Sequence, residues 1–143
     1  MKVRDIMTTS VETVDSSTTI QECARKMKEL DIGSLPVCDG ERIQGLVTDR
    51  DIVINVVARG EDPEKVTVAD AMSSPVVYVF EDDEVGDAVR LMEVKQIRRL
   101  VVLDRDKMLA GFLALGDIAV KAGETLAGET LEQISESRHA QAV

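Results

Sequence analysis

The sequence repeats itself with an offset of 65 residues, and this feature limits the possible folds more than any other. The run from Val3 to Met7 corresponds to the run from Val68 to Met72. After one inserted residue, Gly45 to Val47 corresponds to Gly111 to Leu113. Two copies of one unit predict two small units of similar fold that pack against each other.

We place the first repeat at residues 1–60, a linker at 61–67, the second repeat at 68–123 and a tail at 124–143. The linker contains Pro63 and several charges, which is typical of a connecting segment. The tail carries three aliphatic residues among Glu, Ser and Gln. Either a short amphipathic helix around 129–137 or a frayed tail fits this pattern, and docking across a dimer seam would explain the aliphatic residues. They are Leu126, Leu131 and Ile134.

Each repeat has the pattern of a mixed α/β (α+β) unit with the element order β-α-β-β-α. A short extended run at 11–14 or 76–80 comes first, and a helix follows. In that helix the apolar residues recur at helical spacing, and Thr18 and Thr19 are both candidates for its N-terminal cap. Two strands at 34–38 and 43–47 then meet at a turn at Asp39-Gly40.

A second helix closes each repeat, at 49–59 and at 115–121. In the first repeat its aliphatic residues extend well beyond one stripe, unlike those of a helix on the surface of a monomer. We therefore expect this helix to be covered on two sides, by its own sheet and by a neighbour. The other repeat and a second chain could provide that cover, which predicts tightly paired repeats and a homodimer.

Composition argues against several classes of partner. The formal net charge is −10 and aromatic residues make up 2%, so a nucleic acid or an anionic membrane surface is an unfavourable partner. No apolar run approaches the length of a membrane span, and no apolar signal sequence follows Met1, so we expect a cytoplasmic protein. Cys23 and Cys38 are expected to be free core thiols. With His139 as the single histidine, no metal site is predicted.

The repeats resemble CBS (cystathionine-β-synthase-type) domains. The resemblance rests on residues 32–37, on Asp39-Gly40 and on the run from Gly45 to Asp51, with a weaker copy at 97–117. It covers residues 1 to about 123 and implies a tandem pair, or Bateman module, with pseudo-twofold symmetry that forms disc-like homodimers. It also implies clefts for adenosine-containing ligands such as AMP, ADP or ATP, a regulatory role and no catalysis.

The family motif Gly-x-x-Thr/Ser-x-x-Asp falls on Gly45, Thr48 and Asp51. The resemblance implies that Asp51 holds the ribose hydroxyls and that Thr48 lies near the ribose and phosphate. A carboxylate can accept hydrogen bonds from both hydroxyls of a cis-diol. The same two residues also fit a helix-capping pattern that needs no ligand. The two roles can coexist.

The resemblance also implies that Arg98 and Arg99 of the second repeat complete the Asp51 site by binding the phosphate, for which the arginine fork is well suited. The alternative is a pair of surface arginines. Arg50 is a further phosphate candidate that could instead pair with Asp49 or face solvent. Adenine would lie against the first hairpin and the strand beneath it. The residues implied there are Ile32, Gly33, Ser34 and Leu46, for which ordinary packing is the alternative.

The second cleft departs from the motif, because Ala114 replaces the hydroxyl residue while Asp117 remains. Its cross-repeat hairpin offers Asp31 and no cation, so a phosphate there would not be neutralised. We expect one competent site for each chain, with the Asp117 cleft empty or holding an uncharged nucleoside.

The leading hypothesis is a regulatory module that senses an adenine nucleotide and requires no cofactor. The alternative is a structural or protein-interaction module that regulates an unidentified partner without a nucleotide. An enzyme is not expected, because the sequence offers no Cys-His or Ser-His pair and no Gly-rich phosphate loop with lysine.

Overall fold

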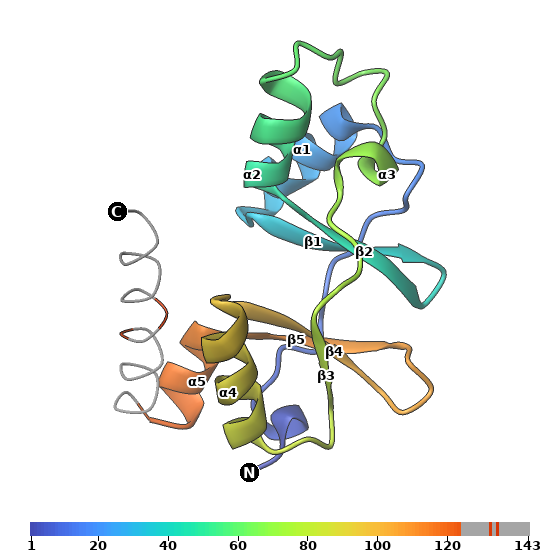
Figure 1. Ribbon diagram of the computed structural model, residues 1–143. Helices are drawn as coiled ribbons and strands as arrows, with labels where there is room; N and C mark the ends of the chain where they lie inside the picture. The colour runs from blue at the N-terminus through green and yellow to red at the C-terminus, as the bar shows by residue number, and fades with distance from the viewer. Residues whose placement is uncertain (124–131, 133, 135–143) are drawn as a thin grey trace. The chain divides into compact units, whose positions relative to one another are not determined.

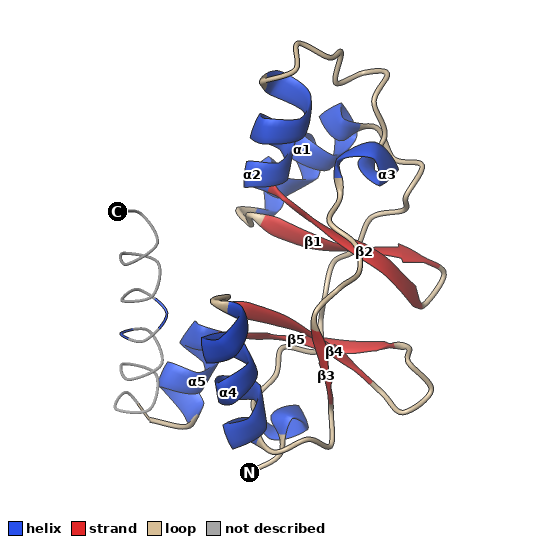
Figure 2. Ribbon diagram, viewed as in Figure 1, coloured by secondary structure: helices blue, strands red, loops and turns tan. Residues whose placement is uncertain are grey.

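The computed structural model describes residues 1–123 together with residues 132 and 134. Two compact units make up the chain (Figure 1). The continuous unit is Glu12–Val76, and the discontinuous unit combines Met1–Val11 with the chain from Val77 onward. Both units mix helices with a small sheet (Figure 2), as the α+β pattern of the sequence predicts.

The compact units cross the boundaries of the sequence repeats. Val3–Asp5 belongs to the first repeat by sequence, but it lies in the discontinuous unit with the second repeat's strands. Its counterpart Val68–Ala71 lies in the continuous unit with the first repeat's strands. The two repeats have thus exchanged their opening segments.

The continuous unit contains two antiparallel strands with helices on one face of the hairpin (Figure 2). Thr19 caps α1, because its side chain accepts a hydrogen bond from the Glu22 N–H at 3.3 Å, so one of the two predicted caps is correct. Asp39 ends β1 at the predicted turn, and Gly40 takes a positive φ of 69° there. The elements are α1 (Ile20–Leu30), β1 (Ser34–Asp39), β2 (Arg42–Thr48), α2 (Asp49–Ile52), η2 (Val53–Val57) and α3 (Val68–Ala71).

The discontinuous unit contains a three-stranded sheet of order β3-β4-β5, with α4 and α5 on one face (Figure 2). The pairing of β3 with β4 is parallel and that of β4 with β5 antiparallel. This unit follows the predicted order β-α-β-β-α in full. Its elements are η1 (Val3–Asp5), β3 (Tyr78–Phe80), α4 (Val85–Lys95), β4 (Arg99–Leu103), β5 (Leu109–Ala114) and α5 (Leu115–Lys121).

The predicted strand at 11–14 is wrong for most of its length. Only Val14 pairs with the sheet, in a parallel bridge to Val37. The Thr13 carbonyl accepts a hydrogen bond from the Lys26 ammonium instead, and the Val11 N–H bonds the nearby Thr9 carbonyl. With these groups engaged elsewhere, the segment cannot extend the ladder.

The first closing helix begins at Asp49 as predicted, but it widens after one turn. Residues Val53–Val57 form a π-helical segment, closed by an Ala58 N–H bond to the Val53 carbonyl at 2.8 Å. Four of these five residues are β-branched, and such side chains are stiff and crowd an α-helix. The helix buries Val56 and leaves Val53, Ile54 and Val57 exposed on the described chain.

A glycine on the second hairpin strand admits the exchanged segment in each unit. A Cβ atom at Gly45 would lie 2.6 Å from Met72 Sδ and 2.8 Å from the Ser73 carbonyl oxygen. At Gly111 the corresponding distances, to Met7 Sδ and to the Thr8 carbonyl oxygen, are both 2.7 Å. Only glycine permits this approach. Antiparallel bridges then form, Leu46 with Ser73 and Thr8 with Phe112.

Each unit has its own aliphatic core. The core of the continuous unit includes Ile20, Leu35 and Val47, and that of the discontinuous unit includes Met92, Leu113 and Ile118. These residues lie at the apolar positions that the repeat pattern predicts for helices and strands. None of the described helices is long and apolar enough to cross a membrane.

Two residues of the predicted tail helix are described, and both are helical. Ile134 is fully buried and belongs to the core of the discontinuous unit, whereas Glu132 is exposed. The burial of Ile134 indicates that this residue packs on its own chain. The other predicted tail residues, Leu126 and Leu131, lie outside the described residues, as does His139.

Candidate functional site

The start of α2 forms a corner of the continuous unit in which Thr48 and Asp51 bond each other. Thr48 Oγ1 accepts from the Asp51 N–H at 3.0 Å, and the Asp51 carboxylate accepts from the Thr48 N–H at 2.9 Å. This is the capping arrangement that the sequence allows as the alternative to ribose binding. Both side chains remain partly exposed, so the cap does not exclude a ligand.

Ser73 is a member of this corner that the sequence analysis did not identify. Its hydroxyl donates to Asp51 Oδ1 at 3.3 Å, while Asp51 Oδ2 accepts from the Thr48 N–H. Both carboxylate oxygens therefore have a protein donor. The repeat contained the relevant signal, because Met7-Thr8 and Met72-Ser73 correspond and each pair ends in a hydroxyl residue.

The predicted adenine-binding residues lie at the same corner. Ser34 pairs with Thr48 across the hairpin, and the Gly33 carbonyl accepts from the Asp49 N–H at 2.9 Å. A Cβ atom at Gly33 would lie 2.9 Å from Asp49 Oδ2, so glycine suits this approach. Ile32 is exposed and Leu46 is partly buried in the sheet. The fold thus brings these residues and the Thr48–Asp51 pair onto one part of the unit.

The equivalent corner of the discontinuous unit contains the predicted phosphate-binding arginines. The Arg98 carbonyl accepts from the Leu115 N–H at 2.9 Å, and Arg99 pairs with Ala114 in the hairpin. Asp117 accepts from the Ala114 N–H at 2.8 Å, as Asp51 does from Thr48. Arg98 and Arg99 therefore have the places that Gly33 and Ser34 have in the continuous unit.

Charge differs between the two corners. Three acidic residues, Asp31, Asp49 and Asp51, lie around the first corner. Arg98 and Arg99 are exposed, and within the described residues neither they nor Arg50 form an ion pair. Free guanidinium groups of this kind can receive an anion. That Arg98 and Arg99 meet the ligand of Asp51 stays a prediction.

Both cysteines lie in the continuous unit as buried free thiols. Burial raises the pKa of the Cys38 thiol to about 11, with a further contribution from the negative charges of Asp39 and Asp15. Burial also raises the pKa of Cys23. A thiol with a raised pKa is protonated at neutral pH and is a poor nucleophile or metal ligand. In the described part of the chain, no group of three potential metal-binding side chains occurs.

Two further ion pairs of the discontinuous unit involve Arg105 and Lys2. Arg105 pairs with Asp82 at 2.8 Å and lies over the Phe80 ring, 4.1 Å from its centroid. The hydrogen bond from Arg105 lowers the pKa of the Asp82 carboxyl. Lys2 likewise lowers the pKa of Glu84 through a 2.7 Å ion pair. These pairs connect surface loops within the discontinuous unit and point to structural roles.

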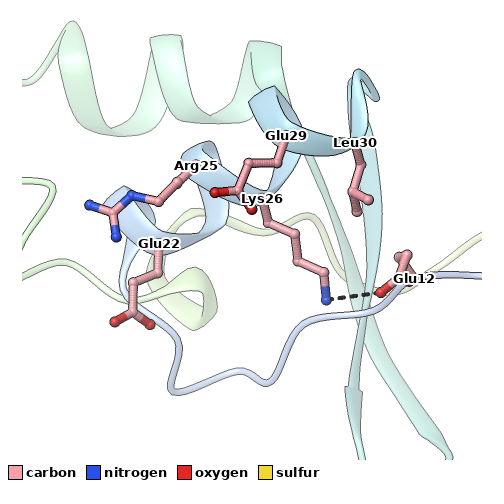
Figure 3. A pocket seen from close by; sticks show the side chains of 6 residues that line it. All are labelled: Glu12, Glu22, Arg25, Lys26, Glu29 and Leu30. Carbon is pink, nitrogen blue, oxygen red and sulfur yellow. Dashed lines mark ion pairs between the residues drawn. The ribbon is translucent and has the colours of Figure 1, made fainter.

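A pocket of about 330 Å³ lies along α1, and its lining includes none of the predicted site residues (Figure 3). Lys26 points toward Glu12 there and pairs with it at 3.3 Å. The lining mixes both signs of charge, which favours no single class of ligand. It consists of Glu12, Glu22, Arg25, Lys26, Glu29 and Leu30.

The fold and the equivalent corners of the two units define a tandem-repeat module of the α+β class. The chain matches the family described as CBS domain over residues 3–58 and 68–124. It is 40% identical over 134 residues to the CBS domain-containing protein YhcV of Bacillus subtilis, an alignment that covers 93% of this chain and 94% of YhcV. The chain belongs to the CBS domain family, as the sequence predicts.

Solved CBS-pair structures resemble the chain throughout most of its length. Hypoxic Response Protein I with two coordinated zinc ions has a TM-score of 0.77 and 36% identity, with 84% of this chain and 98% of that protein covered. CBSX2 in complex with AMP has a TM-score of 0.74, 27% identity and coverage of 85% and 95%. The CBS domain pair of MJ0100 in complex with 5-methylthioadenosine and S-adenosyl-L-methionine has a TM-score of 0.75 and 26% identity, with 86% of this chain and 100% of that chain covered. Some members of this family therefore bind adenosine-containing molecules.

Proposed function

We propose that this chain is a regulatory sensor that binds an adenosine-containing nucleotide at the corner formed by Thr48, Asp51 and Ser73. The observation that carries the proposal is the half-buried Asp51 carboxylate, held by donors on both oxygens and yet partly exposed. A carboxylate has about four acceptor positions, so capacity for two ribose hydroxyls remains. The AMP complex of CBSX2 and the MJ0100 complex support the ligand class.

The proposal assigns the phosphate to Arg98 and Arg99, with Arg50 as a further candidate. Their exposed guanidinium groups have no ion-pair partner among the described residues, which supports this role. Ile32, Gly33, Ser34 and Leu46 are assigned to adenine. No catalytic step is proposed, in keeping with the generally regulatory character of the family. The cytoplasmic location expected from the sequence stays a prediction.

Nucleotide binding can be tested by melting the protein with AMP, ADP, ATP and S-adenosylmethionine. A ligand at 100 times its dissociation constant adds about 2.7 kcal/mol, or about 5–10 °C in Tm. We expect Asp51→Ala to abolish the shift and Asp117→Ala, its counterpart in the other repeat, to leave it intact. Absence of any shift in the wild-type protein, or an intact shift in Asp51→Ala, would contradict the proposal.

A role of the arginines predicts a separate signature. The double variant Arg98→Ala/Arg99→Ala should weaken AMP binding and leave the binding of uncharged adenosine little changed. The substitutions remove only the contacts between the guanidinium groups and the phosphate, which adenosine lacks. Calorimetric titration with AMP and with adenosine measures the difference. Equal losses for both ligands would argue against a phosphate contact.

The exposed apolar face of the first closing helix also favours the predicted homodimer. Val53, Ile54 and Val57 are 53%, 49% and 65% exposed on one helical segment, although all three are apolar. Adjacent exposed aliphatic residues favour a protein contact. We propose that a second copy of this chain covers this face, as the apolar pattern of the closing helix predicts.

Light scattering coupled to gel filtration tests the homodimer. We expect the wild-type protein at twice the 15.6 kDa chain mass and Val53→Asp/Val57→Asp at the mass of one chain. Arg59→Asp, which adds negative charge in the turn that follows this helix without removing an apolar side chain, is the control. A wild-type monomer would exclude this interface and leave the nucleotide proposal standing.

A further inference from the structure

The backbone fixes Ser73 beside β2. The Leu46 N–H donates to the Ser73 carbonyl at 3.1 Å, and the Ser73 N–H donates to the Leu46 carbonyl at 2.9 Å. Gly45 is needed for this bridge, because its Cβ would lie 2.8 Å from the Ser73 carbonyl oxygen. The place of the Ser73 hydroxyl is therefore set by the strand pairing.

From that place the Ser73 hydroxyl reaches the carboxylate of Asp51. Ser73 Oγ donates to Oδ1 at 3.3 Å, and the Thr48 N–H donates to Oδ2 at 2.9 Å. One donor on each oxygen restricts rotation of the carboxylate more than a single donor does. About one acceptor position is left on each oxygen. Two adjacent acceptors held in this way match the two donors of a vicinal diol.

We propose that Ser73 is a positioning residue for Asp51 and thereby sets the preference of the site for ribose over deoxyribose ligands. This inference rests on the proposed nucleotide binding. Preorganisation of a hydrogen-bonding group reduces the ordering cost of binding. The glycine of the Gly-x-x-Thr-x-x-Asp motif then has an indirect role, because Gly45 admits the segment that carries Ser73.

The discontinuous unit provides a matched control. Thr8 forms the same backbone bridge, with Phe112, beside a glycine of the same tight approach. Within the described residues, however, no hydrogen bond joins the Thr8 hydroxyl to Asp117, whose bond goes to the Ala114 N–H. Thr8→Ala thus removes a hydroxyl from the position equivalent to Ser73 without removing a hydrogen bond to the aspartate of that unit.

The test is calorimetric titration of the full chain with AMP and 2′-deoxy-AMP. We expect Ser73→Ala to weaken AMP binding about five-fold, a modest loss for one bond to a charged group. It should change 2′-deoxy-AMP binding less than two-fold. Ser73→Thr, which keeps the hydroxyl, and Thr8→Ala should bind AMP like the wild type. In an Asp51→Ala background, Ser73→Ala should cause no further loss.

The outcomes separate this inference from the proposed function. If Asp51→Ala loses AMP binding while Ser73→Ala keeps wild-type affinity, the positioning role is wrong and the nucleotide proposal stands. If Ser73→Ala weakens both nucleotides equally, the effect does not act through the diol and the inference is overturned. If the wild-type protein binds neither nucleotide, both fail. The melting temperature of each unliganded variant shows whether the fold is kept.

Discussion

The two units share the parts that build the fold and differ in the parts that could contact a ligand. Each has a glycine that admits the exchanged segment and an aspartate that bonds the N–H three residues before it. Each also has a side chain that donates to a backbone carbonyl of the exchanged segment: Asn55 donates to Ala71, and Lys121 donates to Ile6.

The differences are concentrated at one corner. The Asp51 corner has two hydroxyl groups: that of Thr48 accepts from the Asp51 N–H, and that of Ser73 donates to the Asp51 carboxylate. In the other unit, Ala114 takes the place of Thr48 and has no hydroxyl. The discontinuous unit instead places two arginines at the start of its hairpin. Structural constraints were thus kept in both copies, while the polar chemistry of the corners was free to diverge.

The largest effect is expected from substitution of the two corresponding glycines, Gly45 and Gly111, that admit the exchanged segments. Gly45→Ala and Gly111→Ala should each cost about 1–3 kcal/mol, because the added Cβ meets backbone at 2.7–2.8 Å and the exchanged segment must move. Urea unfolding measures the loss. Gly116→Ala, in an open position on α5, is the control and should gain up to about 1 kcal/mol. Unequal losses at the two glycines would show that the units do not depend equally on exchange.

A second difference appears at high pH, because Cys38 of the continuous unit corresponds to Leu103 of the other. The folded pKa of Cys38 is raised to about 11, above that of a thiol in the unfolded chain. The stabilisation is therefore complete below about pH 8.5 and is lost as the pH rises toward 11, by about 2 kcal/mol. The urea midpoints at pH 8 and at pH 10.5 should differ less for Cys38→Val than for the wild type, because the variant has no thiol to ionise at that position.

Leu103→Val is the matched control for that experiment. It shortens a buried side chain at the corresponding strand position of the discontinuous unit, where nothing titrates. Its effect on stability should be the same at both pH values. An alkaline loss of equal size in the wild type and in Cys38→Val would assign the loss to other groups.

The smallest expected effect concerns the helix caps. Thr48→Ala should cost about 1 kcal/mol because α2 loses the bond from the Asp51 N–H. The reverse change, Ala114→Thr, should gain about 0.5–1 kcal/mol at α5. Chemical unfolding without ligand measures both, with Thr8→Ala as a surface control. If Thr48→Ala is neutral, the cap has no net structural value and the threonine is retained for another reason.

Repeat periodicity predicts most of the elements correctly, because helix and strand positions recur in both copies. The local spacing Thr48-x-x-Asp51 predicts the capping pair, since both residues are close in sequence. The repeat marks Ser73 only as the counterpart of Thr8. It does not predict the contact with Asp51, which joins segments far apart in sequence. Beside the short pairing at Val14, Lys26 donates to the Thr13 carbonyl, and a bond of this kind has no sequence signature.

The exchange of opening segments also could not be read from the repeats. Val3–Asp5 and Val68–Ala71 are similar, and each unit offers the same glycine-lined place to receive one of them. Self-similarity therefore cannot decide which segment goes where. The assignment of Arg98 and Arg99 to the Asp51 ligand comes from the family resemblance, and it stays a prediction.

The crossed chain path determines where this protein can be divided. A cut in the 61–67 stretch separates the sequence repeats, but it leaves the first half without its α3 and the Ser73 bridge. A fragment spanning Glu12–Val76 keeps every partner of its sheet in one uninterrupted peptide. Anyone grafting the Asp51 corner onto another protein should therefore transplant that stretch and not the sequence repeat.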